Sequence, residues 1–167
     1  YGAFCIGENE VIFDNCDVKV NGYPLMLMGM EGLGKSTIQN SRIRGRHFGV
    51  FVVSDDNSVL DIKGSDFVTG KSALCIKGSS TIINVEKTSM KPGNGTIVQL
   101  MDTEESGMNV SAFHVPVGVE DTAMPERDLS TVSPTEDVTL NFIDCQLEGN
   151  LYNSTTNIRA YRNNEIG

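Results

Sequence analysis

Apolar and polar positions follow one recurring frame along this chain. The frame has apolar residues at its first, third and eighth positions and a small polar residue at its sixth position. Successive small positions are 25, 24, 23, 25 and 32 residues apart, which is typical of a repeat protein. The six copies, one of which has Phe113 in the small position, are Val11, Phe13, Cys16, Val18; Ser36, Ile38, Ser41, Ile43; Leu60, Ile62, Ser65, Phe67; Ile83, Val85, Thr88, Met90; Met108, Val110, Phe113, Val115; and Leu140, Phe142, Cys145, Leu147.

A glycine and then a second short strand follow most copies of the frame. The second strands read YPLMLM (23–28), GVFVVS (49–54), SALCIK (72–77) and TIVQLM (96–101), and Tyr152 in NLYNS opens a last one. A single unit of this kind cannot bury its own apolar face, whereas units stacked at ~4.8 Å pair every strand with its neighbours above and below. The sequence therefore predicts one all-β domain over residues 1–167, a right-handed parallel β-helix of about six coils, which we expect to be part of a longer solenoid.

The small position has a structural role in this interpretation. An inward Ser, Thr or Cys leaves room for a sharp bend, and its side chain can hydrogen-bond to its counterpart one coil away. Asn15, Asn40 and Asp144 come directly before small positions, and Asn and Asp tolerate the left-handed backbone conformation that such a bend needs.

Two other repeat folds are disfavoured. Leu140, Phe142, Cys145 and Leu147 resemble part of a leucine-rich repeat, but the leucines expected earlier are replaced by Asp137 and Pro134. The second half of each repeat also alternates with the period of a strand, not of a helix. The period of six that a left-handed hexapeptide helix requires is absent.

One interruption in the repeat lies between His114 and Asp137. It contains three of the five prolines and six acidic residues: Pro116, Pro125, Pro134, Glu120, Asp121, Glu126, Asp128, Glu136 and Asp137. We expect residues 114–137 to be a loop inserted at one corner of the stack. It is either a solvated excursion or a recognition loop on a rigid scaffold.

The charge of the chain restricts its partners. The formal net charge is −9 and the isoelectric point is about 4.6, which opposes association with nucleic acid or anionic lipid. No apolar run approaches the ~18 residues of a membrane span. The chain starts at Tyr1 without a leader pattern, so we expect a mature or excised piece.

A Walker A pattern is present in GMEGLGKST (29–37), with Gly29, Gly34, Lys35 and Ser36 in place. A phosphate loop requires a helix to begin at the Lys-Ser pair. Here Ser36 instead opens a copy of the repeat frame, and the apparent Walker B strand VFVVSDD (50–56) follows too soon for a crossover helix. We therefore interpret the stretch as a glycine-rich corner between coils, and no cofactor is expected.

No catalytic set is complete. Asp55, Asp56, Arg42 and Arg44 resemble fragments of a polygalacturonase site, but the companion Asp-rich and Gly-His-Gly motifs are missing. The chain contains no Trp for a sugar-stacking platform. We expect neither catalytic nor cofactor-binding residues.

Metal sites and disulfides are also disfavoured. The two histidines, His47 and His114, have no cysteine near them at the spacing of metal ligands. The acids Asp102, Glu104 and Glu105 lack the alternating pattern of a calcium loop. Among the four cysteines, Cys16 and Cys145 occupy the same small position about five coils apart, roughly 24 Å, which is too far for a disulfide. A disulfide of Cys5 with another terminal partner stays open.

The repeats, with phrases such as KSALCIKGSSTIINVEKTSMKPGNGTIVQLMD (71–102) and VTLNFIDCQLEGNLYNS (138–154), resemble bacterial surface proteins of the pertactin-like or autotransporter-like β-helix type. The resemblance implies an extracellular, noncatalytic, adhesin-like stalk that meets a surface protein or glycan. Two alternatives remain open: a carbohydrate-active or glycan-binding β-helix, and a subunit that self-associates end to end through exposed strand edges.

Overall fold

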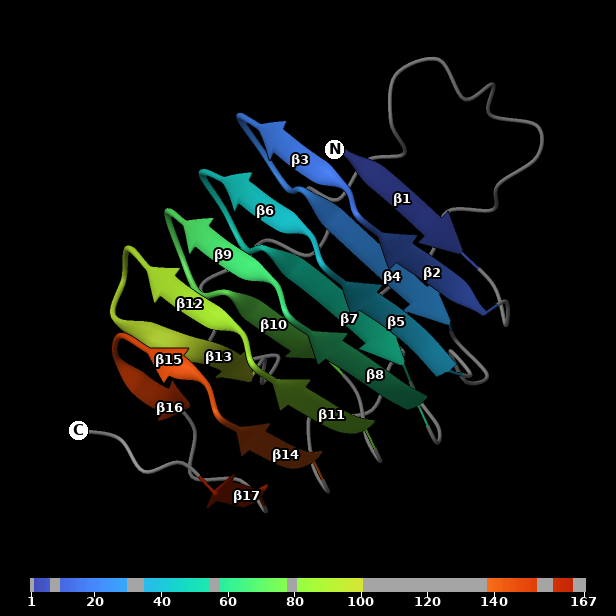
Figure 1. Ribbon diagram of the computed structural model, residues 1–167. Helices are drawn as coiled ribbons and strands as arrows, with labels where there is room; N and C mark the ends of the chain where they lie inside the picture. The colour runs from blue at the N-terminus through green and yellow to red at the C-terminus, as the bar shows by residue number, and fades with distance from the viewer. Residues whose placement is uncertain are drawn as a thin grey trace.

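The computed structural model of the chain describes residues 2–6, 10–29, 35–54, 58–77, 81–100, 138–152 and 158–163. Within these ranges every regular element is a β-strand and no helix occurs. All strand pairs are parallel, and the strands stack in three rows, as Figure 1 shows. The fold is an all-β parallel β-solenoid, as the repeat frame predicts.

Each row of strands is one parallel sheet. Sheet A contains, in order, β1 (Ala3–Ile6), β4 (Leu25–Gly29), β7 (Val50–Ser54), β10 (Leu74–Lys77), β13 (Thr96–Leu100) and β16 (Asn150–Tyr152). Sheet B contains β2 (Val11–Asp14), β5 (Lys35–Gln39), β8 (Ser58–Lys63), β11 (Thr81–Glu86), β14 (Val138–Ile143) and β17 (Ile158–Asn163). Sheet C contains β3 (Asp17–Val20), β6 (Arg42–Gly45), β9 (Asp66–Thr69), β12 (Ser89–Pro92) and β15 (Gln146–Leu147).

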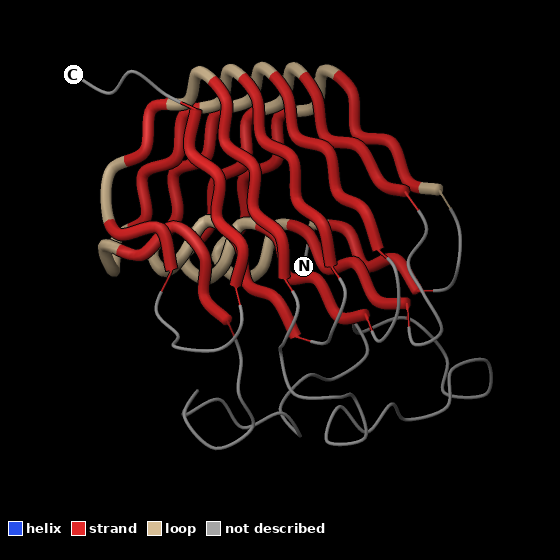
Figure 2. The backbone as a smooth tube through the Cα atoms, turned by 90° about the horizontal axis from the view of Figure 1, so that it is seen from below, coloured by secondary structure: helices blue, strands red, loops and turns tan. Residues whose placement is uncertain are grey.

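The strand register follows the repeat frame. In the described copies of the frame, the first half lies on sheet B, where Leu60 pairs with Ile83 and Ile62 with Val85. The last apolar residue lies on sheet C, and the predicted second strands form sheet A. The chain therefore passes from sheet B through sheet C to sheet A and back to sheet B, and Figure 2 shows these coils from below.

The copy of the frame that begins at Met108 is not a rung of sheet B between β11 and β14. Those two strands pair directly, with Ile83 opposite Leu140, so β14 takes the place that the spacing gives to the Met108 copy. The stretch between β13 and β14 is therefore residues 101–137, longer than the predicted insertion 114–137. Both lie outside the described residues.

The core lies between the three sheets. Inward side chains from all three are almost fully buried, including Leu27, Val52 and Ile76 of sheet A, Phe142 of sheet B and Phe67 of sheet C. Parallel sheets in one coil after another extend this core along the whole stack.

Candidate functional site

The corner between sheets B and C has a repeated left-handed backbone. Asn15, Asn40 and Asp144 have φ angles of 55°, 52° and 51°, which confirms the predicted left-handed conformation before the small position. The two intermediate coils have Gly64 at 57° and Lys87 at 48°. Asn, Asp and Gly adopt this region at low cost, whereas Lys does so rarely. The corner is therefore a tight bend that is repeated coil after coil.

Side chains in the small position join neighbouring coils. The backbone N–H of Cys16 donates to Ser41 Oγ at 3.1 Å, that of Ser41 to Ser65 Oγ at 3.2 Å, and that of Ser65 to Thr88 Oγ1 at 3.3 Å. Each hydroxyl in turn donates to the carbonyl two residues before it, at 2.8 to 3.0 Å. The predicted hydrogen bonding from coil to coil is confirmed, and these residues are structural.

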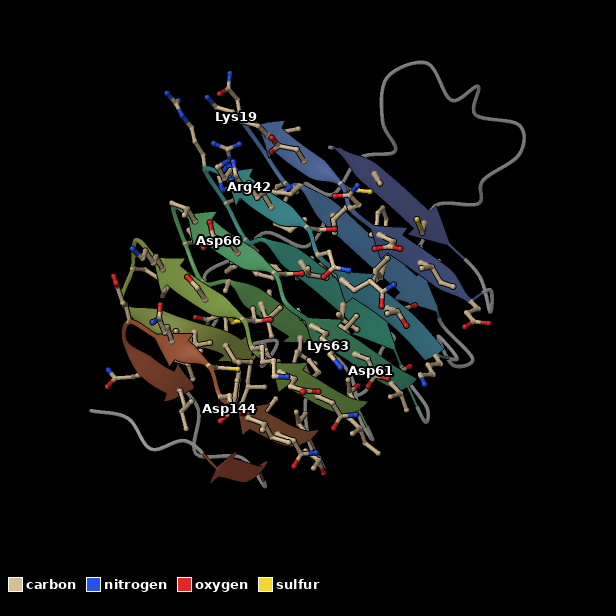
Figure 3. The ribbon with its side chains drawn as sticks, in the orientation of Figure 1. Lys19, Arg42, Asp61, Lys63, Asp66 and Asp144 are labelled. Atoms are coloured by element: carbon tan, nitrogen blue, oxygen red, sulfur yellow. The ribbon has the colours of Figure 1, made fainter. Side chains whose placement is uncertain are left out.

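A groove of about 440 Å³ follows the outside of this corner. Its charged side chains are Arg42, Asp66, Lys87 and Asp144, and Ser89 Oγ donates to Asp66 Oδ1 at 2.8 Å. Figure 3 shows Arg42, Asp66 and Asp144 along the corner. Two cations and two acids leave the groove close to neutral, although the whole chain has a net charge of −9. Such a lining can bind hydroxyls, amides and paired charges, and it lacks the apolar walls of a typical small-molecule pocket.

The outer face of sheet C borders the groove. Arg42 of β6 stands opposite Asp17 of β3 on one side and Asp66 of β9 on the other. Arg44 donates to Asp17 Oδ1 at 2.8 Å, and this hydrogen bond lowers the pKa of the Asp17 carboxyl, with smaller contributions from the charges of Arg44, Arg42 and Lys19. Arg44 is thereby held in place, whereas no ion pair of Arg42 occurs in the described part of the chain.

The outer face of sheet B contains a second polar ladder. Asn141 Nδ2 donates to Asn84 Oδ1 at 2.7 Å, and Asn84 Nδ2 donates to Asp61 Oδ1 at 2.8 Å. Lys35 Nζ lies 3.2 Å from Asp61 Oδ2 at the end of this row. The side chains of this ladder bind one another from coil to coil, so we assign it a stabilising role.

The structure is incompatible with a phosphate loop at the Walker pattern. Gly29 ends β4 and Lys35 begins β5, so a strand stands where the helix of a phosphate loop must start. Ser36 is 1% exposed on the core side of β5, where its hydroxyl cannot reach a bound magnesium ion. Gly34 and the rest of residues 30–34 lie outside the described part.

The other candidate residues are only partly within the described ranges. Arg42 and Arg44 lie on β6, whereas Asp55 and Asp56 belong to the stretches that the structure does not describe. His47 stacks on Tyr23 with the ring centroids 4.7 Å apart, and its pKa is lowered by burial and by the nearby charges of Lys71 and Arg46.

The described residues contain neither a metal-ligand cluster nor a disulfide. His114, Asp102, Glu104 and Glu105 lie outside the described ranges, within which no cluster of three metal-ligating side chains is found. All four cysteines are free thiols, including Cys5, whose pairing the sequence leaves open. Cys16 and Cys145 do share the small position, but four strand steps separate β3 from β15, not five.

In comparisons with known proteins, no family model, curated protein or solved structure matches this chain. The chemistry of its surface is therefore the basis for a functional proposal. Among the described residues, no helix is long and apolar enough to cross a bilayer.

Sequence reasoning missed the groove. Its lining follows from the left-handed corner, because the residue after each small position turns outward at the start of sheet C. Aligning the copies of the frame would have placed Arg42, Asp66, Ser89 and Gln146 in one outward column. These four residues differ in type, so no repeated letter marks the column.

Proposed function

We propose that this chain is a noncatalytic, adhesin-like module of the cell surface or extracellular space, which acts as a rigid stalk and binds an extended polar partner along the groove of the B–C corner. The observation that carries the proposal is the coil-to-coil ladder of Cys16, Ser41, Ser65 and Thr88 directly beneath the groove. It holds the groove residues of successive coils in a fixed register, which reduces the entropy lost on binding.

A glycan fits this groove best. Its hydroxyls can donate to the carboxylates of Asp66 and Asp144 and accept from Arg42 and Lys87. The near-neutral lining gives no strong preference for a charged polymer, and the groove runs across several coils, parallel to the stack. A surface protein is the other partner class that the sequence suggests.

The finer description of the fold belongs to the same proposal. Sheets A and B contain six described strands each, which supports the expected about six coils. Crossovers between parallel strands are right-handed in nearly all proteins, which supports a right-handed winding. We further propose that residues 1–167 form one domain of a longer solenoid.

A glycan array with the purified chain tests the function. We expect binding to a defined set of glycans, and we expect Arg42→Ala and Asp66→Ala to weaken it by at least ~10-fold, because each removes a charged hydrogen-bonding group. Lys35→Ala on the outer face of sheet B is the matched control and should bind normally. Absence of glycan binding, or binding that survives both groove substitutions, would refute the assignment to this groove.

A further inference from the structure

The surface cations of the described coils differ in whether they have an acidic partner. Five of them form an ion pair, with N–O distances of 2.8 to 3.6 Å: Lys35, Arg44, Lys63, Lys87 and Lys91. Four others are exposed and form no ion pair in the described part of the chain: Lys19, Arg42, Arg46 and Lys71. We call these four residues the basic patch.

The basic patch lies on sheet C and on the corner between sheet C and sheet A. Lys19 belongs to β3, and Arg42 belongs to the neighbouring strand β6, as Figure 3 shows. Arg46 directly follows β6. The N–H of Lys71 donates to the carbonyl of His47 at 3.3 Å, which places Lys71 one coil beyond Arg46. The four unpaired cations therefore come from three successive coils.

Two acids border the basic patch, and other side chains already bind both of them. Arg44 donates to Asp17 Oδ1 at 2.8 Å, and Ser89 Oγ donates to Asp66 Oδ1 at 2.8 Å. With Arg44 included, five cations face two acids, so this surface is positive although the whole chain has a net charge of −9. At physiological salt the Debye length is about 8 Å, so the nearby cations determine which partners are attracted.

We propose that the basic patch binds an acidic polysaccharide, in which successive sugars carry a carboxylate or a sulfate. Neighbouring coils are about 4.8 Å apart, so a polymer that runs along the stack can place its acids against Lys19, then Arg46 and then Lys71. An Arg guanidinium can donate two parallel hydrogen bonds to the oxygens of one acidic group. The inference goes beyond the proposed function, because its surface shares with the groove only Arg42.

Aromatic rings beside the cations add contact area for a sugar. His47 follows Arg46 and stacks on Tyr23 with the ring centroids 4.7 Å apart, and both side chains are partly exposed. The Lys71 ammonium lies 5.8 Å from the centroid of the Phe48 ring. Aromatic side chains offer rigid, amphipathic contact area, which suits a ring that has both C–H and hydroxyl groups. The corner can therefore hold a sugar ring beside the cations that bind its acid.

A single polysaccharide strand fits the charge distribution better than a nucleic acid or a membrane. Domains that bind nucleic acid are typically basic as a whole, whereas this chain has an isoelectric point of about 4.6. A membrane surface would bring anionic headgroups close to the acids outside the patch as well. A polysaccharide strand can contact the patch alone, so it avoids most of this repulsion.

Titration calorimetry of the purified chain with polygalacturonate, dextran sulfate and neutral dextran tests the proposal. The test variant combines Lys19→Gln, Arg46→Gln and Lys71→Gln. We expect the parent chain to bind at least one of the two acidic polymers and not neutral dextran, and the test variant to bind at least ~10-fold more weakly. Which polymer binds distinguishes a carboxylate from a sulfate. Added salt should weaken binding, and less steeply in the test variant.

A matched control removes the same amount of charge from ion-paired positions. Lys35→Gln, Lys63→Gln and Lys91→Gln together should leave the affinity for the acidic polymer unchanged. Lys19→Arg with Lys71→Arg retains the charge of the patch and should also bind normally. All of these side chains are exposed, so the fold should be retained, and circular dichroism checks this.

Several results overturn the proposal. The first is a parent chain that binds neither acidic polymer, and the second is a test variant that binds as tightly as the parent or the control. Tighter binding of single-stranded DNA or of phosphatidylserine vesicles would assign the patch to another class of partner. A dimer in light scattering that the test variant abolishes would assign it to a second copy of the chain.

Asp66→Ala separates this inference from the proposed groove. The substitution is expected to weaken glycan binding in the groove, whereas the loss of an acid opposite Arg42 should not weaken polygalacturonate binding to the patch. Weaker polygalacturonate binding by Asp66→Ala would assign the acidic polymer to the groove and overturn the inference. Patch-dependent binding of an acidic polymer without any effect of Asp66→Ala on glycan binding would refute the groove assignment alone.

Discussion

Replacing Lys87 by asparagine tests the backbone strain at the B–C corner. Lys87 has a φ of 48°, and the left-handed region costs a residue with a Cβ about 1–2 kcal/mol, which Asn partly avoids. The same position in other coils is occupied by Asn15, Asn40, Gly64 and Asp144. Lysine is thus the residue least suited to this conformation among the five.

The expected gain in the free energy of unfolding is the backbone strain that is relieved minus the contribution of the ion pair that is lost. Lys87 Nζ lies 3.6 Å from Glu86 Oε1, and the two side chains are 62% and 38% exposed, so the pair contributes at most about 0.5 kcal/mol. We expect Lys87→Asn to raise the free energy of unfolding by about 0.5–1 kcal/mol. Lys87→Gly should be nearly neutral, because glycine adds about 0.5–1 kcal/mol of backbone entropy to the unfolded state.

Urea unfolding followed by circular dichroism measures these differences in the free energy of unfolding. The slope of that free energy against urea concentration should be the same in all variants. Gly64→Ala at the equivalent corner is the reverse control. It should lower stability by about 1–2 kcal/mol, since φ is 57° and a Cβ there would lie 3.1 Å from Asn40 Oδ1. If Lys87→Asn is no more stable than the parent chain, the assignment of strain to this corner is wrong.

Three further substitutions test individual contacts. Ser36→Ala should raise the free energy of unfolding by about 1 kcal/mol, because the hydroxyl is buried without a hydrogen-bond partner in the described structure; no change in urea unfolding would count against this. Ser65→Ala should lower it by about 1–3 kcal/mol, because the Ser41 N–H loses its acceptor at 3.2 Å, and Ser65→Thr should restore most of the loss. Arg44 lowers the pKa of Asp17 below its ordinary 3.8, so this contact stabilises the fold above pH 3.8 and the stabilisation is lost as the pH falls through the folded-state pKa. Arg44→Gln should therefore raise that pKa in an NMR titration, and an unchanged value would contradict the assigned contact.

The stacking of the coils could be predicted because each frame places the same residue types on the same faces. Apolar pairs such as Leu60 and Ile83 recur at a nearly constant spacing, and parallel in-register pairing is the arrangement that buries them all. Asn15 and Asn40 predict the corner for a separate reason, since their side chains tolerate a left-handed backbone.

Which strands become neighbours could not be predicted for every copy. The Met108 copy has the right apolar pattern and the right spacing, yet β14 pairs with β11 in its place. A local pattern of apolar residues indicates which face of a strand is buried. It does not indicate which of two candidate strands, here the Met108 copy or β14, pairs with β11. The groove could not be predicted for a related reason. Arg42, Asp66 and Ser89 occupy the same position in successive coils but are of different residue types.

The direct pairing of β11 with β14 across residues 101–137 shows that chain length at the A-to-B corner is uncoupled from strand register. Ile83 pairs with Leu140 on one side and with Leu60 on the other, in the same parallel register. The chain that connects the paired strands nevertheless differs greatly in length. This corner is consequently the natural place to graft a foreign peptide or a whole domain, since new chain can enter and leave there without displacing the rungs on either side.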